Sequence, residues 1–235
     1  ALFTETLPKY LLEELKLIPK NAALFNIHFP KSSEALAKAQ FRLKFEELFY
    51  IQLQLITKNL IRKHKIKGHP FSKVGELFND FYQNHLPFDL TNAQKRVIKE
   101  IRTDMGSNAQ MNRLLQGDVG SGKTIVAFMS MLLALDNGFQ ACLMAPTEIL
   151  ANQHFIGLSE FATTLNINIK ILTGSTKTAA RKIIHEELEN GSLQILIGTH
   201  ALLEDKVQFQ NLSLAVIDEK HRFGVEQRSK LWMKG

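Results

Sequence analysis

The feature that most constrains this chain is a glycine-rich stretch that ends in a lysine and a threonine. Residues 117–124 read Gly-Asp-Val-Gly-Ser-Gly-Lys-Thr and fit the pattern G-x-x-x-x-G-K-[ST]. The apolar pair Leu114-Leu115 precedes it, and an apolar run over residues 125–135 follows it. We expect a strand over residues 111–116 and a buried helix over residues 125–135. Strand, glycine loop and helix are the setting of a phosphate-binding loop. The stretch therefore predicts an α/β fold with a nucleoside triphosphate site.

The residues of this loop have definable tasks. Glycine permits left-handed backbone angles and a close approach to a phosphate. The loop N–H groups and the helix N-terminus face the anion. We expect Lys123 to reach the β- and γ-phosphates, and the Thr124 hydroxyl to bind Mg²⁺. The residues expected to hold the nucleotide are Gly117, Asp118, Val119, Gly120, Ser121, Gly122, Lys123 and Thr124.

Two adjacent carboxylates mark a second chemical site. Residues 214–217 are apolar and are expected to form a strand, and Asp218 and Glu219 follow at its end. Asp218 is placed to hold the Mg²⁺ that Thr124 also contacts. Glu219 is placed to accept a proton from the water that attacks the γ-phosphate. Together with Lys123, the two carboxylates specify phosphoryl transfer to water.

From residue 86 onward, short apolar runs alternate with helical stretches, which is typical of a mainly parallel α/β sheet. Strands are expected at residues 140–145, 167–172, 194–197 and 214–217. Polar or glycine residues follow each strand, at positions 146–147, 173–175, 198–200 and 218–219. Ligands of open α/β sheets bind at the carboxyl ends of the strands. We therefore expect these segments and the glycine loop to converge on one edge of the sheet.

Residues 1–85 are expected to form an all-helical arm without enzyme chemistry. Helices are expected at residues 6–17 and 21–28, from Ser32 or Ser33 to about Lys65, and at residues 73–84. Apolar side chains recur every three or four residues along the long helix, which is typical of a packing face. They are Phe41, Phe45, Phe49, Leu53, Ile56 and Leu60. The expected domains are a helical linker arm over residues 1–85 and an ATP-binding lobe over residues 86–235.

The positive charge of the chain is concentrated in the arm. The net charge is +6, and residues 1–85 hold 13 Lys and Arg against 8 Asp and Glu, with 16 against 15 in the remainder. The excess gathers at Lys58, Arg62, Lys63, Lys65 and Lys67. This basic cluster is equally consistent with binding of nucleic-acid phosphate and with a solvated helix end.

Cysteine content and hydropathy indicate the compartment. Cys142 is the sole cysteine, which excludes an internal disulfide and a cysteine-based metal site. Its apolar surroundings in the sequence favour a packed core thiol. The longest apolar run is too short to span a bilayer, and we find no N-terminal signal pattern. We therefore expect a cytoplasmic protein without a membrane partner.

Six blocks stand in order along the chain: P-F-D-L-T-N-A-Q (87–94), L-L-Q-G-D-V-G-S-G-K-T (114–124), M-A-P-T-E-I-L-A-N-Q-H (144–154), L-T-G-S (172–175), I-G-T-H-A-L (197–202) and D-E-K-H-R-F-G-V-E-Q-R (218–228). They resemble the motifs of superfamily 2 helicases and translocases, and among these the branch-migrating DNA helicases of bacteria. The resemblance implies that residues 86–235 are a first RecA-like motor lobe. It implies that residues 1–85 are a helical linker to an upstream wedge domain.

The resemblance also implies roles for single residues. Gln94 would read the adenine edge and so select ATP, with Phe88 packed nearby. Six further residues match motifs that line the DNA path or couple it to ATP: Pro146, Thr147, Thr173, Gly174, Thr199 and His200. The implied activity is that of a monomeric helicase that uses ATP and Mg²⁺ on branched DNA, such as forks and four-way junctions, in recombination and repair.

Two features depart from the complete family pattern. Lys220 stands where related sequences usually carry Gln or another non-basic residue. A cation that faced Asp218 and Glu219 would compete for their charge, and we expect Lys220 to face solvent instead. The sequence ends at Gly235, before a second motor lobe with its arginine finger, and it lacks a wedge domain. We therefore expect a fragment that binds ATP–Mg²⁺ weakly and hydrolyses it very slowly.

Three alternatives stay open. A transcription-repair coupling translocase has a motor that shares Arg-Phe-Gly-Val (222–225), although Ser121 and residues 146–151 favour the branch-migrating helicases. A P-loop kinase or small-molecule ATPase would account for the loop but not for the block at residues 218–228. A non-catalytic binding module with a relict ATP site is disfavoured by the intact catalytic residues.

Overall fold

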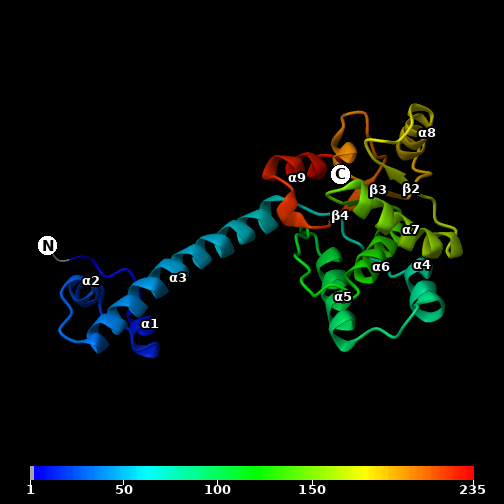
Figure 1. The fold of residues 1–235 in the computed structure, drawn as a ribbon. Coiled ribbons are helices and arrows are strands. Elements are labelled where there is room, and N and C mark those ends of the chain that lie inside the picture. The colour runs from blue at the N-terminus through cyan, green and yellow to red at the C-terminus, as the bar shows by residue number, and fades with distance from the viewer. Residues whose placement is uncertain (1–2) are drawn as a thin grey trace. The chain divides into compact units, whose positions relative to one another are not determined.

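The chain divides into two compact units, Ala1–Ile66 and Lys67–Gly235, in the computed structural model (Figure 1). The structure describes residues 3–235, apart from the side chains of residues 62–65. The domain boundary expected from the sequence lies after residue 85 instead. Residues 67–85 pack with the second unit because Phe81 is fully buried there, with ring centroids 5.1 Å from Phe128 and 5.2 Å from Phe161. The division of tasks between residues 1–85 and 86–235 stays a prediction.

A parallel four-stranded sheet forms the centre of the second unit. The strands lie in the order β2-β3-β1-β4, and each neighbouring pair is parallel. Every residue of β1 and β3 is buried, as expected for a parallel sheet that is covered on both faces. The four strands are β1 (Gln140–Met144), β2 (Ile169–Leu172), β3 (Ile195–Gly198) and β4 (Leu212–Ile217). The predicted α/β class and its mainly parallel sheet are confirmed.

Helices cover the two faces of this sheet. They are α4 (Glu76–Asp80), α5 (Asn92–Met105), α6 (Lys123–Asp136), α7 (Glu148–Thr164), α8 (Thr178–Glu189) and α9 (Val225–Trp232), with short turns η1 (Phe81–His85), η2 (His200–Leu203) and η3 (Lys220–Arg222). Ala141 and Leu143 of β1 lie in one core with α5, α6 and α7. Cys142 and Met144 lie in a second core with α8 and α9. Cys142 is fully buried, which confirms that it is a core thiol, and this burial raises the pKa of the thiol to about 12.

Helix α6 is the central helix of the first of these cores. Residues 125–135 are buried, except for the half-buried Ala127, so the predicted buried helix is confirmed. Its last residue, Asp136, accepts hydrogen bonds from the backbone N–H groups of Gly75, Leu77 and Phe78 at 3.0 to 3.1 Å. A carboxylate in this position satisfies the free N–H groups at the start of α4.

The strand predicted over residues 111–116 is wrong, because the described chain has no regular element there. Leu114 is 60% exposed, so the apolar pair does not enter the sheet. Arg113 instead holds the segment to α5, where its guanidinium pairs with Glu100 at 2.6 Å and with Asp104 at 2.7 Å. The segment is thus held by ion pairs to α5 and not by the strand-to-strand hydrogen bonds that its sequence suggested.

The first unit contains α1 (Lys9–Glu14), α2 (Lys20–His28) and the long α3 (Ser33–Lys65). The helices agree with the predicted ones to within a few residues. Ser32 Oγ accepts a hydrogen bond from the Ala35 N–H at 3.1 Å, so Ser32 caps α3 as expected. Fully buried Arg42 pairs with both Glu5 and Glu46. This ion-pair network ties the N-terminal segment to α3.

The apolar stripe along α3 is only partly covered within the described unit. Phe45 and Phe49 are half-buried and stack with centroids 5.9 Å apart. Phe41 is 60% exposed and Leu60 is 54% exposed. The role of the stripe as a packing face stays a prediction.

The basic cluster of the arm is described in part. The side chains of Arg62, Lys63 and Lys65 lie outside the described residues, so its contact with nucleic acid stays a prediction. Among the described helices, none is both long and apolar enough to cross a membrane.

Candidate nucleotide-binding site

The four strands end at one edge of the sheet. Met144 lies opposite Gly198 of β3 and Ile217 of β4, and Leu172 of β2 also lies opposite Gly198. Each of these residues is the last of its strand. The segments that follow therefore lie along the same edge, and the expected convergence of the four strand ends is confirmed.

The glycine-rich loop immediately precedes α6. Gly120 and Gly122 have φ angles of +80° and +78°, which glycine adopts without the strain that a side chain brings. Lys123 is the first residue of α6, and its Nζ donates hydrogen bonds to the carbonyl oxygens of Gly117 at 2.6 Å and Asp118 at 2.7 Å. The ammonium group therefore lies inside the loop, where phosphate oxygens would replace the carbonyl oxygens.

The other loop residues differ in exposure. Val119 is fully exposed, and Ser121 is also exposed. Thr124 is half-buried in the first turn of α6. These positions are compatible with a loop that presents backbone N–H groups to a ligand and keeps Thr124 close to the helix N-terminus.

Gln94 connects the start of α5 to the glycine-rich loop. Its Oε1 accepts from the Thr91 N–H at 2.8 Å, and its Nε2 donates to the Ser121 carbonyl oxygen at 2.9 Å. The Gln94 N–H donates in turn to Thr91 Oγ1 at 3.2 Å, which completes a capping box. Gln94 was expected to read adenine, and its contact with the loop was not expected from the sequence. Phe88, its expected companion, is 47% exposed.

Asp218 follows β4, and both of its carboxylate oxygens are hydrogen-bonded. Oδ1 accepts from the Glu219 N–H at 2.9 Å, and Oδ2 lies 2.8 Å from Nε2 of His154. The hydrogen bond from His154 lowers the pKa of Asp218, burial partly opposes this, and the charge of Lys123 adds to the lowering. Asp218 is therefore ionised and within electrostatic reach of Lys123. The two predicted chemical sites lie on the same side of the sheet.

Glu219 adopts a left-handed backbone conformation, with φ of 51° and ψ of 52°. Such conformations are uncommon for residues with a side chain and concentrate at functional sites. The Glu219 carboxylate lies 3.2 Å from Nε2 of His221, and both side chains are well exposed. Lys220 is exposed as well, as the sequence analysis expected.

The six residues expected along the DNA path divide into buried and exposed groups. Thr173 and Thr199 are buried, with 4% and 1% of their surface exposed. Thr199 Oγ1 has no hydrogen-bond partner among the described residues. Thr147 caps α7, since its side chain accepts from the Leu150 N–H at 3.2 Å. Pro146 is half-buried, and Gly174 and His200 are exposed. The assignment of these residues to a DNA path stays a prediction.

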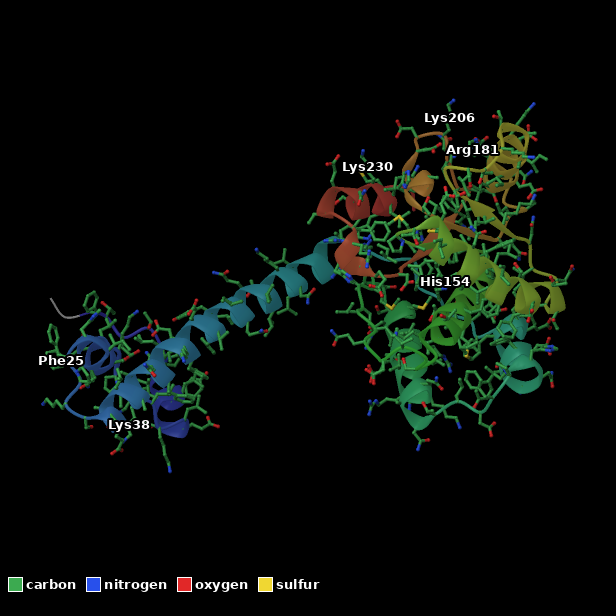
Figure 2. The ribbon with its side chains drawn as sticks, in the orientation of Figure 1. Phe25, Lys38, His154, Arg181, Lys206 and Lys230 are labelled. Carbon is green, nitrogen blue, oxygen red and sulfur yellow. The ribbon has the colours of Figure 1, made fainter. Side chains whose placement is uncertain are left out.

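Two charged residues that the sequence analysis did not assign to the site connect the strand-end segments. The Glu148 carboxylate accepts from Ser175 N at 3.1 Å and from Ser175 Oγ at 2.9 Å, and these hydrogen bonds lower its pKa. Arg181 of α8, which Figure 2 labels, donates to the Thr173 carbonyl oxygen at 2.7 Å and pairs with Glu204 at 2.8 Å. The sequence carried no signal for Arg181, because its partners belong to other elements.

The residues present at this edge fit a magnesium–nucleotide complex. Thr124 supplies a hydroxyl and Asp218 an ionised carboxylate, and Mg²⁺ prefers oxygen ligands of this kind. A Cβ at Gly120 would meet no atom within 4 Å, whereas a Cβ at Gly122 would lie 2.2 Å from Gln94 Nε2. The loop therefore has free space beside Gly120, whereas the Gln94 side chain packs directly against Gly122. An open loop at a helix N-terminus favours an anion.

The chain is similar to proteins of known family. Residues 91–234 match the family DEAD/DEAH box helicase. The chain is 48% identical to ATP-dependent DNA helicase RecG of Synechocystis sp.. The match covers 100% of this chain and 28% of that protein. It is also 48% identical to ATP-dependent DNA helicase RecG of Thermotoga maritima, with 98% of this chain and 29% of the relative covered.

A solved structure is similar to the chain as well. The structure of RecG bound to a three-way DNA junction shows a TM-score of 0.78 and 46% sequence identity over 94% of this chain and 30% of that one. The chain thus spans less than a third of each of these three proteins.

Proposed function

This chain belongs to the DEAD/DEAH box helicase family, and on that premise we propose that it is the ATP-binding motor lobe of a RecG-type DNA helicase. In this proposal residues 86–235 form the motor lobe and residues 1–85 the linker arm. The longer protein hydrolyses ATP and uses the energy to move along DNA.

One observation carries the proposal. The ammonium group of Lys123 lies inside the glycine-rich loop at the start of α6, and Asp218 directly follows β4 at the edge where the strands end. The two residues are 95 positions apart in sequence. The fold brings their elements together, because α6 packs against β4. A phosphate-binding lysine opposite an ionised carboxylate is the arrangement that phosphoryl transfer requires.

Each site residue has a proposed task. When bound, ATP–Mg²⁺ supplies the γ-phosphate and the positive charge that neutralises the phosphate oxygens. Lys123 leaves the carbonyl oxygens of the loop and donates to phosphate oxygens. Thr124 and Asp218 would hold the metal ion, through a hydroxyl and a carboxylate oxygen respectively. Glu219 accepts a proton from the attacking water.

Gln94 retains capacity for adenine in this scheme. A glutamine amide has two N–H donors and two acceptor lone pairs. Thr91 takes one acceptor site and Ser121 takes one donor. One donor and one acceptor are left for the adenine edge, with Phe88 beside it. Gln94 would thus sense both the base and the phosphate loop.

We propose that branched DNA, such as forks and four-way junctions, is the substrate of the longer protein, in recombination and repair. The support is the similarity to the RecG structure with a three-way junction. Thr147, Gly174 and His200 are accessible on the edge that would face DNA. A second motor lobe and a wedge domain of the same protein complete the motor, which acts as a monomer in the cytoplasm.

The proposed lobe by itself is expected to bind ATP and to hydrolyse it very slowly. In related enzymes an arginine finger contributes about 10³–10⁵ in rate, and the second lobe would supply it. Robust DNA-stimulated hydrolysis by the 235-residue chain alone would contradict this part of the proposal.

The test compares Glu219→Gln with Lys123→Ala. In the full-length protein, Glu219→Gln should lower DNA-stimulated ATP hydrolysis by about 10²–10⁴, because it removes a general base. In the 235-residue chain, the same variant should keep its affinity for ATP–Mg²⁺, measured with a fluorescent nucleotide. Lys123→Ala should lose both binding and hydrolysis. Full hydrolysis by Glu219→Gln, or unchanged nucleotide affinity of Lys123→Ala, would refute the assigned roles.

A further inference from the structure

His154 contacts Asp218 although it lies outside the residues that the motif reading assigns to the nucleotide. Its Nε2 is 2.8 Å from Asp218 Oδ2. The side chains are 17% and 30% exposed, so the contact is partly shielded from water. Figure 2 labels His154 within the second unit. The contact joins helix α7 to the end of β4.

The sequence of α7 explains why His154 lies there. Ala151, Leu158 and Ala162 are buried, and His154 follows Ala151 by three positions and precedes Leu158 by four. Residues three and four apart share one helix face, so His154 is the polar member of the face that packs toward the sheet. It lies in the second turn of the helix, close to the edge where the strands end.

The N-terminus of α7 is held from two sides. Thr147 caps the helix through the Leu150 N–H. Glu148 accepts two hydrogen bonds from Ser175. Because these contacts fix the first turn of α7, the position of His154 in the next turn is also well defined.

The chemistry of the contact determines its direction. An aspartate side chain is ordinarily ionised at neutral pH and a carboxylate only accepts hydrogen bonds, so His154 Nε2 is the donor in this contact. A neutral imidazole with its proton on Nε2 and an imidazolium ion both donate from this atom. The contact therefore holds in either protonation state of His154. With Oδ1 held by the Glu219 N–H, both oxygens of Asp218 have a defined orientation.

We propose that His154 is a positioning residue that holds the Asp218 carboxylate in the orientation required for magnesium–nucleotide binding. The inference rests on the proposed function, because it takes Asp218 as the metal ligand. Partners of a ligating group orient it, and their loss typically costs 10- to 100-fold in metal affinity or activity. His154 acts through Asp218 and is not itself a metal ligand or a catalytic group.

The test uses three substitutions in the 235-residue chain. His154→Gln keeps an N–H donor close to the place of Nε2. His154→Asn is also polar but is one methylene too short to reach Asp218, and His154→Leu removes the donor. Binding of a fluorescent ADP is titrated with Mg²⁺ and, separately, in the presence of EDTA. Thermal unfolding of each variant checks that it folds.

We expect a loss of nucleotide affinity that appears only in the presence of Mg²⁺. His154→Leu and His154→Asn should weaken the Mg²⁺-dependent part of nucleotide binding by about 10- to 100-fold. Their nucleotide affinity in EDTA should match that of the wild-type chain. His154→Gln should retain most of the Mg²⁺ dependence. Asn and Gln carry the same amide and differ by one methylene. Comparing them therefore tests whether the donor must reach Asp218 or need only be polar, even if the Leu variant does not fold.

Two outcomes would overturn the inference. One is wild-type Mg²⁺ dependence in His154→Asn. The other is an equal loss of affinity with Mg²⁺ and with EDTA, which would indicate general damage to the site. A wild-type chain without Mg²⁺-dependent nucleotide binding would instead refute the proposed function, and the inference with it.

Discussion

The side-chain Nε2 of Gln94 donates a hydrogen bond to the carbonyl oxygen of Ser121 at 2.9 Å. The capping box that begins α5 therefore also fixes the phosphate-binding loop from behind. The next residue along the loop is Gly122, where a Cβ would lie 2.2 Å from the same nitrogen. A residue with a side chain at position 122 would therefore displace the Gln94 amide from its contact with Ser121, in addition to adopting a left-handed backbone angle.

Gly122→Ala is expected to destabilise the fold more than Gly138→Ala does. The two glycines have nearly equal φ angles of +78° and +79°, so alanine brings a similar left-handed strain at both, about 1–2 kcal/mol. A Cβ at Gly138 would meet no atom within 4 Å, and Gly138 is therefore the matched control. The free energy of unfolding in urea measures the difference.

The same experiment isolates the contribution of Gln94. In a Gln94→Ala background, the extra cost of Gly122→Ala over Gly138→Ala should shrink, because the clashing amide is gone. Contacting residues typically couple by 0.5–3 kcal/mol in such cycles. Equal costs for the two glycine substitutions in the wild-type background would show that the loop moves away from Gln94 freely.

Acid is expected to weaken the first unit through Glu5. Burial raises the pKa of Glu5, but three backbone N–H donors and the charge of Arg42 outweigh it and lower the pKa from 4.5 to about 2. A carboxyl with a lowered folded-state pKa stabilises the fold fully above its unfolded value. The contribution is therefore present above pH 4.5 and is lost as the pH falls toward 2. Glu46, the other partner of Arg42, also has a lowered pKa.

Hydrogen exchange of α2 and α3 measures this effect in the whole chain, after correction for the intrinsic exchange rates. Wild-type protection should fall across the acid range. Glu5→Gln should be less protected at neutral pH and should change less with acid, because it has no carboxyl to protonate. An identical acid response in the two proteins would exclude Glu5 as the titrating group.

Lys220→Gln is expected to alter ATP hydrolysis by the full-length protein by less than about tenfold, or ~1.4 kcal/mol. Lys220 is exposed, so its charge is screened by water before it reaches Asp218. Steady-state hydrolysis with DNA present is the measurement, and Glu219→Gln in the neighbouring position is the matched comparison. A larger effect of Lys220→Gln would mean that the lysine faces the carboxylates or the second lobe.

Elements whose signals lie within a few neighbouring residues were predictable from the sequence. Thr91 and Thr147 cap their helices through N–H groups three residues on, and this is a local rule. Strand β1 ends just before Pro146, as its apolar run suggests. The shared edge of the strand ends follows from the parallel topology.

Features that depend on partners far along the chain were not predictable. The stretch around Leu114 has a strand-like composition, yet the ion pairs of Arg113 with α5 determine its course. Gln94 was assigned a ligand role because its contact with Ser121 requires the folded loop. His154 was detectable as a polar residue on a buried helix face. Its contact with Asp218 was not predictable, although Asp218 itself was predicted as a site residue, because 64 positions separate the two residues.

Helix α6 has its loop end at Lys123 and its other end at Asp136, where it holds the start of α4. Its 14 residues span about 21 Å at 1.5 Å per residue. Close-packed interiors deform little and transmit strain. An axial displacement of α6 when a ligand arrives would therefore reach the amide groups of Gly75, Leu77 and Phe78, which makes them remote reporters of occupancy.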